Sequence, residues 1–84
     1  MRNFKLNLLD NFSYDGEIDY EFYNGNIAEA RRIFNLFGDN GLVMLNRDLN
    51  SLNRAWSRCS DGAKKDAIAA QIRTQVLIIK ELMD

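Results

Sequence analysis

The feature that most constrains the fold is a pair of helical seams in the C-terminal half of the chain. In the first, apolar residues recur at alternating spacings of three and four: Leu42, Leu45, Leu49, Leu52, Trp56 and Cys59. The second seam has the same spacing and consists of Ile68, Ile72, Gln75, Ile79 and Leu82. Each seam places one stripe along one side of a helix, and such stripes bury each other. Because the break between them is short, they predict helices over about 42–58 and 61–83, packed as an antiparallel hairpin.

A shorter helix is predicted over about 27–37. Its apolar stripe has spacings of three, four and three, and consists of Ile27, Ala30, Phe34 and Phe37. Asn26 is a favoured N-cap residue, and Glu29 follows three residues later, as in a capping box. Gly38 suits the position directly after the last helical residue.

The N-terminal part of the chain has a different period. From residue 4 to residue 22, apolar or aromatic side chains share the even positions: Phe4, Leu6, Leu8, Phe12, Ile18, Tyr20 and Phe22. Asp10 is a charged residue in the same register. This alternation is the signature of a strand with one buried face. Asp15 and Gly16 form a strong turn signal, and a three-residue loop over 14–16 keeps the apolar residues on one face. The pattern therefore predicts a two-stranded antiparallel β-hairpin over about 4–23.

Together these elements predict a single α+β domain over 1–84, in which the apolar face of the hairpin packs on three helices. The third helix has more apolar side chains than one seam needs. Outside the seam it carries Ala69, Ala70, Val76, Leu77, Ile78 and Met83. A helix that is apolar on several sides is either central or packed against another chain. We therefore predict that the protein forms a homo-oligomer through its C-terminal helices.

Composition argues against several kinds of site. The chain has no histidine and a single cysteine, Cys59, which disfavours imidazole catalysis, a structural zinc site and an intrachain disulfide. It also lacks the glycine-rich nucleotide-binding motifs and the serine-hydrolase motif. We therefore predict a protein that is not an enzyme and has no metal or cofactor. The lone cysteine and the absence of a long apolar run predict a cytoplasmic protein without a membrane span.

The stretch from Asn11 to Phe22 resembles an EF-hand calcium loop in its spacing. With Gly16 at the sixth position, polar residues fall at the first, third, fifth, seventh and ninth. The twelfth position should supply a bidentate glutamate but holds Phe22, and the first holds Asn11 in place of aspartate. Loss of the bidentate carboxylate removes much of the ligation of the ion. The sequence therefore argues against calcium binding.

Acidic residues are concentrated near the N-terminus, where residues 1–30 carry six acidic and two basic side chains. On the predicted hairpin, Glu17, Asp19 and Glu21 share the outer face of the second strand, and Tyr23 follows on the same face. Such a row can dock on a basic partner surface, with an exposed tyrosine as an anchor. The simpler alternative is a solvated outer face whose charge discourages edge pairing.

The second predicted helix carries Arg47, Arg54 and Arg58 on one side. Guanidinium groups suit phosphates, so these residues offer a second hypothesis: an oligomer that binds a nucleotide, another phosphate ligand or nucleic acid. No aromatic residue is interleaved with them, which weakens the case for nucleic acid. A solvated helix face explains them equally simply.

These patterns favour a small non-enzymatic protein-binding module. We expect an inhibitor or accessory protein of the type encoded by phages and mobile elements, which acts by occupying a basic surface of another protein. The predicted contact residues are Glu17, Asp19, Glu21 and Tyr23.

Overall fold

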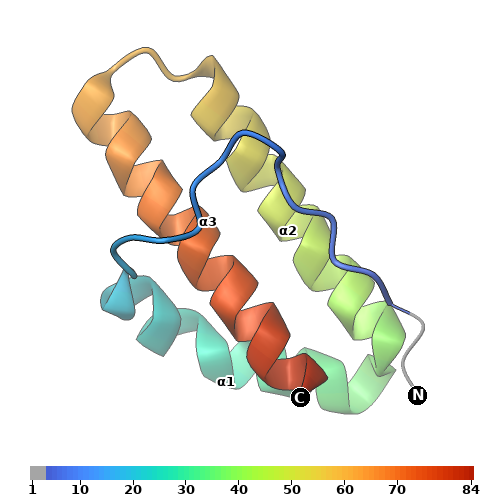
Figure 1. The fold of residues 1–84 in the computed structure, drawn as a ribbon. Helices are drawn as coiled ribbons and strands as arrows, with labels where there is room; N and C mark the ends of the chain where they lie inside the picture. The colour runs from blue at the N-terminus through green and yellow to red at the C-terminus, as the bar shows by residue number, and fades with distance from the viewer. Residues whose placement is uncertain (1–3) are drawn as a thin grey trace.

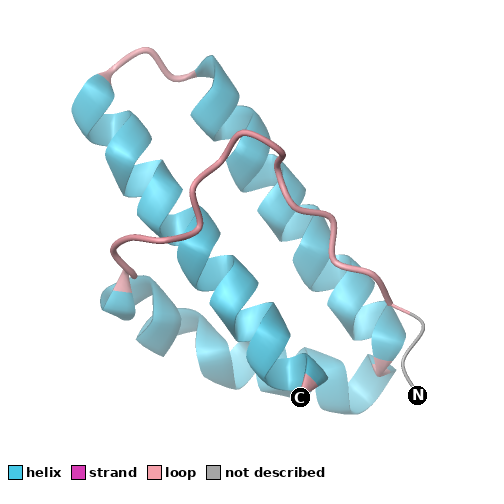
Figure 2. Ribbon diagram, viewed as in Figure 1, coloured by secondary structure: helices cyan, strands magenta, loops and turns pink. Residues whose placement is uncertain are grey.

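The structure is a computed structural model that describes residues 4–84, and this part of the chain contains three helices and no strand (Figure 1, Figure 2). Helix α1 spans Tyr20–Phe37, α2 spans Asp39–Arg58 and α3 spans Gly62–Met83. The antiparallel hairpin of α2 and α3 is confirmed, and α1 packs against both helices.

The predicted β-hairpin is wrong, and the fold of residues 4–84 is all-α rather than α+β. Residues 4–19 form an extended stretch with neither helix nor strand, here called the N-terminal segment, and residues 20–23 already belong to α1. The segment runs along α2, bends at a turn formed by Asp10 and Asn11, and then crosses α3 to reach α1 without pairing as strands (Figure 1). A single extended chain lying on helices buries alternate side chains, so it shows the same period as a strand in a sheet.

Arg73 of α3 binds the backbone of the N-terminal segment where the prediction had a second strand. The predicted three-residue loop over 14–16 would have placed Ser13 opposite Glu17. In the structure, the Arg73 Nε donates to the Glu17 carbonyl oxygen at 2.9 Å, and its Nη1 donates to the Ser13 carbonyl oxygen at 3.4 Å. The carbonyl oxygens of these two residues are therefore satisfied by one helix side chain instead of by a second strand.

Helix α1 begins at Tyr20 rather than near residue 27, because Asp19 caps it. The Asp19 Oδ1 accepts from the Phe22 backbone N–H at 2.9 Å, and the Asp19 N–H donates to the Thr74 Oγ1 at 2.8 Å. Asn26, the predicted cap, lies inside the helix, where its Nδ2 donates to the Phe22 carbonyl oxygen at 2.7 Å. The cap is thus fixed by a contact with α3 that local sequence does not reveal.

Gly38 alone separates α1 from α2. Its φ of +58° is in the left-handed region, and its N–H donates to the Phe34 carbonyl oxygen at 2.7 Å. A Cβ added at Gly41 would lie 2.7 Å from the Ile33 carbonyl oxygen, so glycine permits the close approach of α2 to α1.

Helix α3 is the centre of the core. Its buried apolar residues are Ala69, Ile72, Val76, Ile78, Ile79 and Leu82. α1, α2 and the N-terminal segment cover it from different sides (Figure 1). Its broad apolar circumference, which suggested self-association, is therefore largely covered within one chain. Self-association through the C-terminal helices stays a prediction.

Within residues 4–84, no helix combines the length and apolar character needed to cross a membrane.

Candidate functional site

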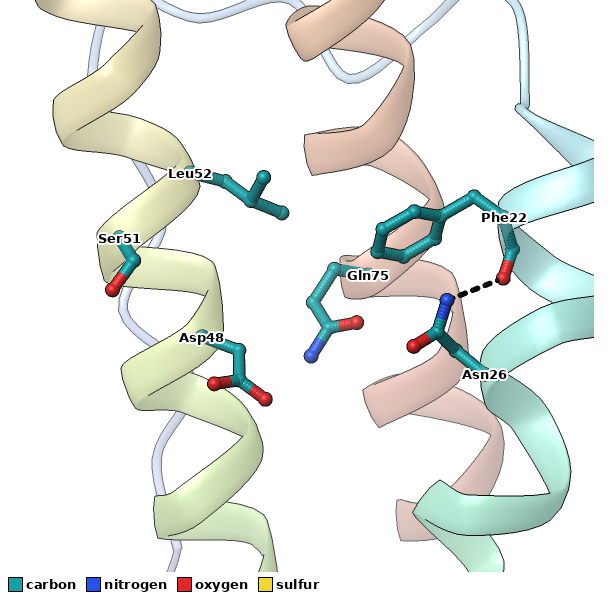
Figure 3. A pocket seen from close by; sticks show the side chains of 6 residues that line it. All are labelled: Phe22, Asn26, Asp48, Ser51, Leu52 and Gln75. Atoms are coloured by element: carbon teal, nitrogen blue, oxygen red, sulfur yellow. Dashed lines mark hydrogen bonds between the residues drawn. The ribbon is translucent and has the colours of Figure 1, made fainter.

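A cavity of about 330 Å³ lies between α1 and α2, on the side of the molecule away from the N-terminal segment (Figure 3). Its lining residues are Phe22, Asn26, Asp48, Ser51, Leu52 and Gln75. Phe22 and Asn26 stand one turn apart on α1. Asp48, Ser51 and Leu52 stand on the facing side of α2, and Gln75 of α3 forms the floor. Successive helical turns thus place an apolar pair and a carboxylate around one opening.

Gln75 is the polar residue in the otherwise apolar seam of α3. Its side chain is only 3% exposed, and its Nε2 donates to the Leu45 carbonyl oxygen at 3.0 Å. Its carbonyl oxygen has no hydrogen-bond partner among the residues that the structure describes, and Figure 3 shows the amide at the base of the cavity. This oxygen lies at the cavity and is therefore a candidate acceptor for a ligand donor.

A second cavity, of about 340 Å³, is lined by Asp19, Glu21, Phe22 and Gln71. Because Phe22 also lines the first cavity, the two adjoin at this ring. We call the pair the acidic groove. All the charged side chains that line it are acidic, namely Asp19, Glu21 and Asp48. Neither Glu21 nor Asp48 forms an ion pair with any residue in the range 4–84.

The predicted acidic row does not form, because residues 17–23 contain no strand to align it. Glu17 lies in the N-terminal segment, where its backbone oxygen is bound by Arg73. Asp19 caps α1, and Glu21 stands in the first turn of that helix, next to the positive end of the helix dipole. Asp19 and Glu21 nevertheless line the acidic groove, whereas Glu17 does not. The structure adds Asp48, which sequence periodicity did not single out.

Tyr23 does not line this groove, and its side chain ties α1 to α3. Its hydroxyl donates to the Glu81 Oε2 at 2.7 Å. That hydrogen bond raises the pKa of Tyr23 above its ordinary value, and desolvation and the charge of Glu81 act in the same direction. Tyr23 therefore has a structural contact that the predicted role as a partner anchor did not anticipate.

The three arginines of the second hypothesis lie on the exposed surface of α2. Arg47, Arg54 and Arg58 are all exposed, and the Arg54 Nη2 donates to the Ser51 Oγ at 3.2 Å. None of them lines the acidic groove. Phosphate binding through these residues stays a prediction.

Metal ligation finds no support in the side-chain arrangement. Among the described residues, no group of three or more acidic or cysteine side chains is placed to hold a metal ion.

In comparisons with known proteins, no family model matches the chain, and neither the curated proteins nor the solved structures include one with significant similarity to it.

Proposed function

We propose that this protein is a small non-enzymatic binding module that holds a basic, partly apolar segment of a partner protein in its acidic groove. The observation that carries the proposal is the composition of the groove. Its charged lining residues are all acidic, and Phe22 and Leu52 supply apolar surface between them. A lysine or arginine side chain matches this combination, because its aliphatic stem can lie on the ring while its cationic head meets a carboxylate.

The position of the carboxylates supports binding to a segment rather than to a single side chain. Asp48 lies on α2, whereas Asp19 and Glu21 lie at the start of α1, so Phe22 stands between acidic residues of two helices. A helix or extended segment carrying two basic residues can contact both ends at once. Asn26 and Gln75 add an amide rim and floor for polar groups between them.

In this role the protein acts by occupying a basic surface of its partner, as an inhibitor or accessory protein. Complementary charge guides such an encounter and discriminates against acidic partners. A cytoplasmic location belongs to the same proposal and rests on the single cysteine, Cys59.

The test is an NMR titration of the ¹⁵N-labelled protein with an amphipathic peptide built of leucine and lysine. We expect saturable shifts at the amides of Phe22, Leu52 and Gln75, and weaker binding as added salt screens the charges. The same peptide with glutamate in place of lysine should not bind. Equal binding of the two peptides, or shifts confined to residues outside the groove, would refute the proposal.

A double variant tests the carboxylates directly. Glu21→Gln combined with Asp48→Asn should weaken binding of the leucine–lysine peptide by about tenfold, since each exposed ion pair contributes up to ~1 kcal/mol. Asp66→Asn is the matched control, because Asp66 is exposed on α3 and does not line the groove. An equal loss in the control variant would show that net charge, not the groove, governs binding.

A further inference from the structure

A third cavity, of about 150 Å³, lies between α3 and the N-terminal segment. The segment contributes Tyr14 and Ile18, and α3 contributes Arg73, Val76, Leu77 and Lys80. The four α3 residues are spaced three, one and three apart, so they share one helix face. Tyr14 and Ile18, on the opposite wall, lie 55 or more positions earlier in the chain. The cavity therefore exists only when the segment is docked on α3.

The charges of this cavity are opposite to those of the acidic groove. Its charged lining residues, Arg73 and Lys80, are both basic. Neither forms an ion pair with a described residue. Two of the five N–H groups of Arg73 donate to the Glu17 and Ser13 carbonyl oxygens, which fixes the guanidinium in place. The remaining N–H groups can therefore bind a ligand without a large loss of side-chain entropy.

Tyr14 adds a third donor. Its hydroxyl oxygen accepts from the Leu9 backbone N–H at 2.6 Å, which leaves the hydroxyl proton free to be donated. The side-chain polar groups of these lining residues can all donate, so a matching ligand is an anion that accepts from them. The rest of the lining is hydrocarbon from Ile18, Val76 and Leu77.

We propose that this cavity binds a small carboxylic acid with a hydrocarbon body. A cavity of about 150 Å³ can hold a benzene ring, so benzoate is a probe of suitable size. The carboxylate accepts from Arg73, Lys80 and Tyr14, while the ring contacts the aliphatic wall. Inorganic phosphate satisfies the donors but leaves that wall without a partner. The same chemistry is present at the C-terminus of a peptide that ends in an apolar residue.

The experiment is a ¹H–¹⁵N NMR titration of the full chain with sodium benzoate and with benzamide, which has the same ring but no charge. We expect saturable shifts with benzoate at Ile18, Arg73 and Leu77, and binding of benzamide weaker by about fivefold or more. Inorganic phosphate should be similarly weak. Equal binding of benzamide or phosphate, no saturable binding of benzoate, or shifts centred on α2 would overturn the proposal.

Variants at Lys80 test the assignment without disturbing Arg73, which also holds the segment. Lys80→Gln should weaken the binding of benzoate by about fivefold, which is the upper range for one exposed charge pair. Lys64→Gln is the matched control, since Lys64 is exposed on the same helix but does not line the cavity. A loss in Lys64→Gln equal to that in Lys80→Gln would contradict the site.

Two further ligands distinguish the source of the carboxylate. N-acetylphenylalanine presents the C-terminal carboxylate of a peptide, and its amide lacks that charge. Tighter binding of N-acetylphenylalanine than of benzoate assigns the cavity to a peptide C-terminus, and tighter binding of benzoate assigns it to a free organic acid. If N-acetylphenylalanine amide binds as tightly as the acid, carboxylate recognition is refuted.

Discussion

At the scale of single residues, Gly16 and Arg73 decide the path of the N-terminus. Gly16 has a φ of +153°, which L side chains rarely adopt, and a Cβ placed there would lie 3.0 Å from the Arg73 Cζ. The guanidinium beside it also lies over the Phe12 ring, 5.9 Å from the centroid. The glycine that suggested a hairpin turn instead makes room for an arginine from α3.

Gly16→Ala should therefore lower the free energy of unfolding by about 1–3 kcal/mol, the usual range for a strained backbone conformation. Gly25→Ala is the matched control, because Gly25 lies inside α1 and nothing is within 4 Å of the added Cβ. That substitution should stabilise the protein by about 0.5–1 kcal/mol. Urea denaturation of both variants checks the pair, and equal effects would contradict the role given to Gly16.

At the scale of elements, the start of α1 shows how tertiary contact overrides local signals. Asn26 and Glu29 have the spacing of a capping box, yet the helix runs on past them towards the N-terminus as far as Tyr20. Asp19 serves as the cap because its backbone N–H is held by Thr74, whose hydroxyl in turn donates to the Ala70 carbonyl oxygen at 2.7 Å. The first turns of α1 carry Glu21 and Phe22 into the acidic groove, so this cap also positions the candidate site.

Asp19→Ala should lower the free energy of unfolding by about 0.5–2 kcal/mol, the range for loss of an N-cap side chain. Asn26→Ala should change the free energy of unfolding by less than about 0.5 kcal/mol. It removes the hydrogen bond to the Phe22 carbonyl oxygen, but alanine is a better helix former than asparagine, and the two effects offset each other. Thermal denaturation followed by circular dichroism measures both. A larger effect at Asn26 would support the shorter helix that local sequence predicted.

At the scale of the whole molecule, the N-terminal segment completes the core on one side of α2 and α3. Phe12 is 9% exposed, and its ring centroid lies 5.2 Å from that of Trp56 and 4.8 Å from that of Tyr14, both edge-to-face. The Lys65 ammonium lies 4.4 Å from the centroid of Trp56. The single tryptophan of the chain is therefore a direct reporter of whether the segment is docked.

Phe12→Ala should destabilise the protein by about 3–5 kcal/mol, the usual cost of removing a buried aromatic ring. That is a large part of the total stability of a domain this size, so the emission of Trp56 should move to longer wavelength at lower urea concentration. Leu8→Ala, in the same segment, is the control, because Leu8 is 43% exposed. Similar denaturation midpoints for the two variants would show that the segment does not dock as described.

The exposed apolar side chains of the helices bear on self-association. Most of them flank the corner between α1 and α2: Leu36, Phe37, Val43 and Met44, exposed by 62%, 51%, 41% and 40%. They do not lie on α3, where the sequence placed the predicted oligomer contact. An oligomer formed through α3 would have to displace residues that already cover it, whereas this corner is uncovered.

By itself the sequence determined the helical hairpin and the positions of most helix ends, because these depend on spacing within one element. The alternation of residues 4–22 correctly indicated that Phe12 is buried, but it failed at Leu8 and Tyr20, which are 43% and 67% exposed. A strand in a sheet and an extended chain on helices also share that period. Tertiary structure decided between them, since the groups that bind the segment, Arg73 and Thr74, lie 55 to 60 residues away. The same holds for the candidate site. Asp19 and Glu21 were named from the sequence, but their grouping with Asp48 and Gln75 arises only when three helices pack together.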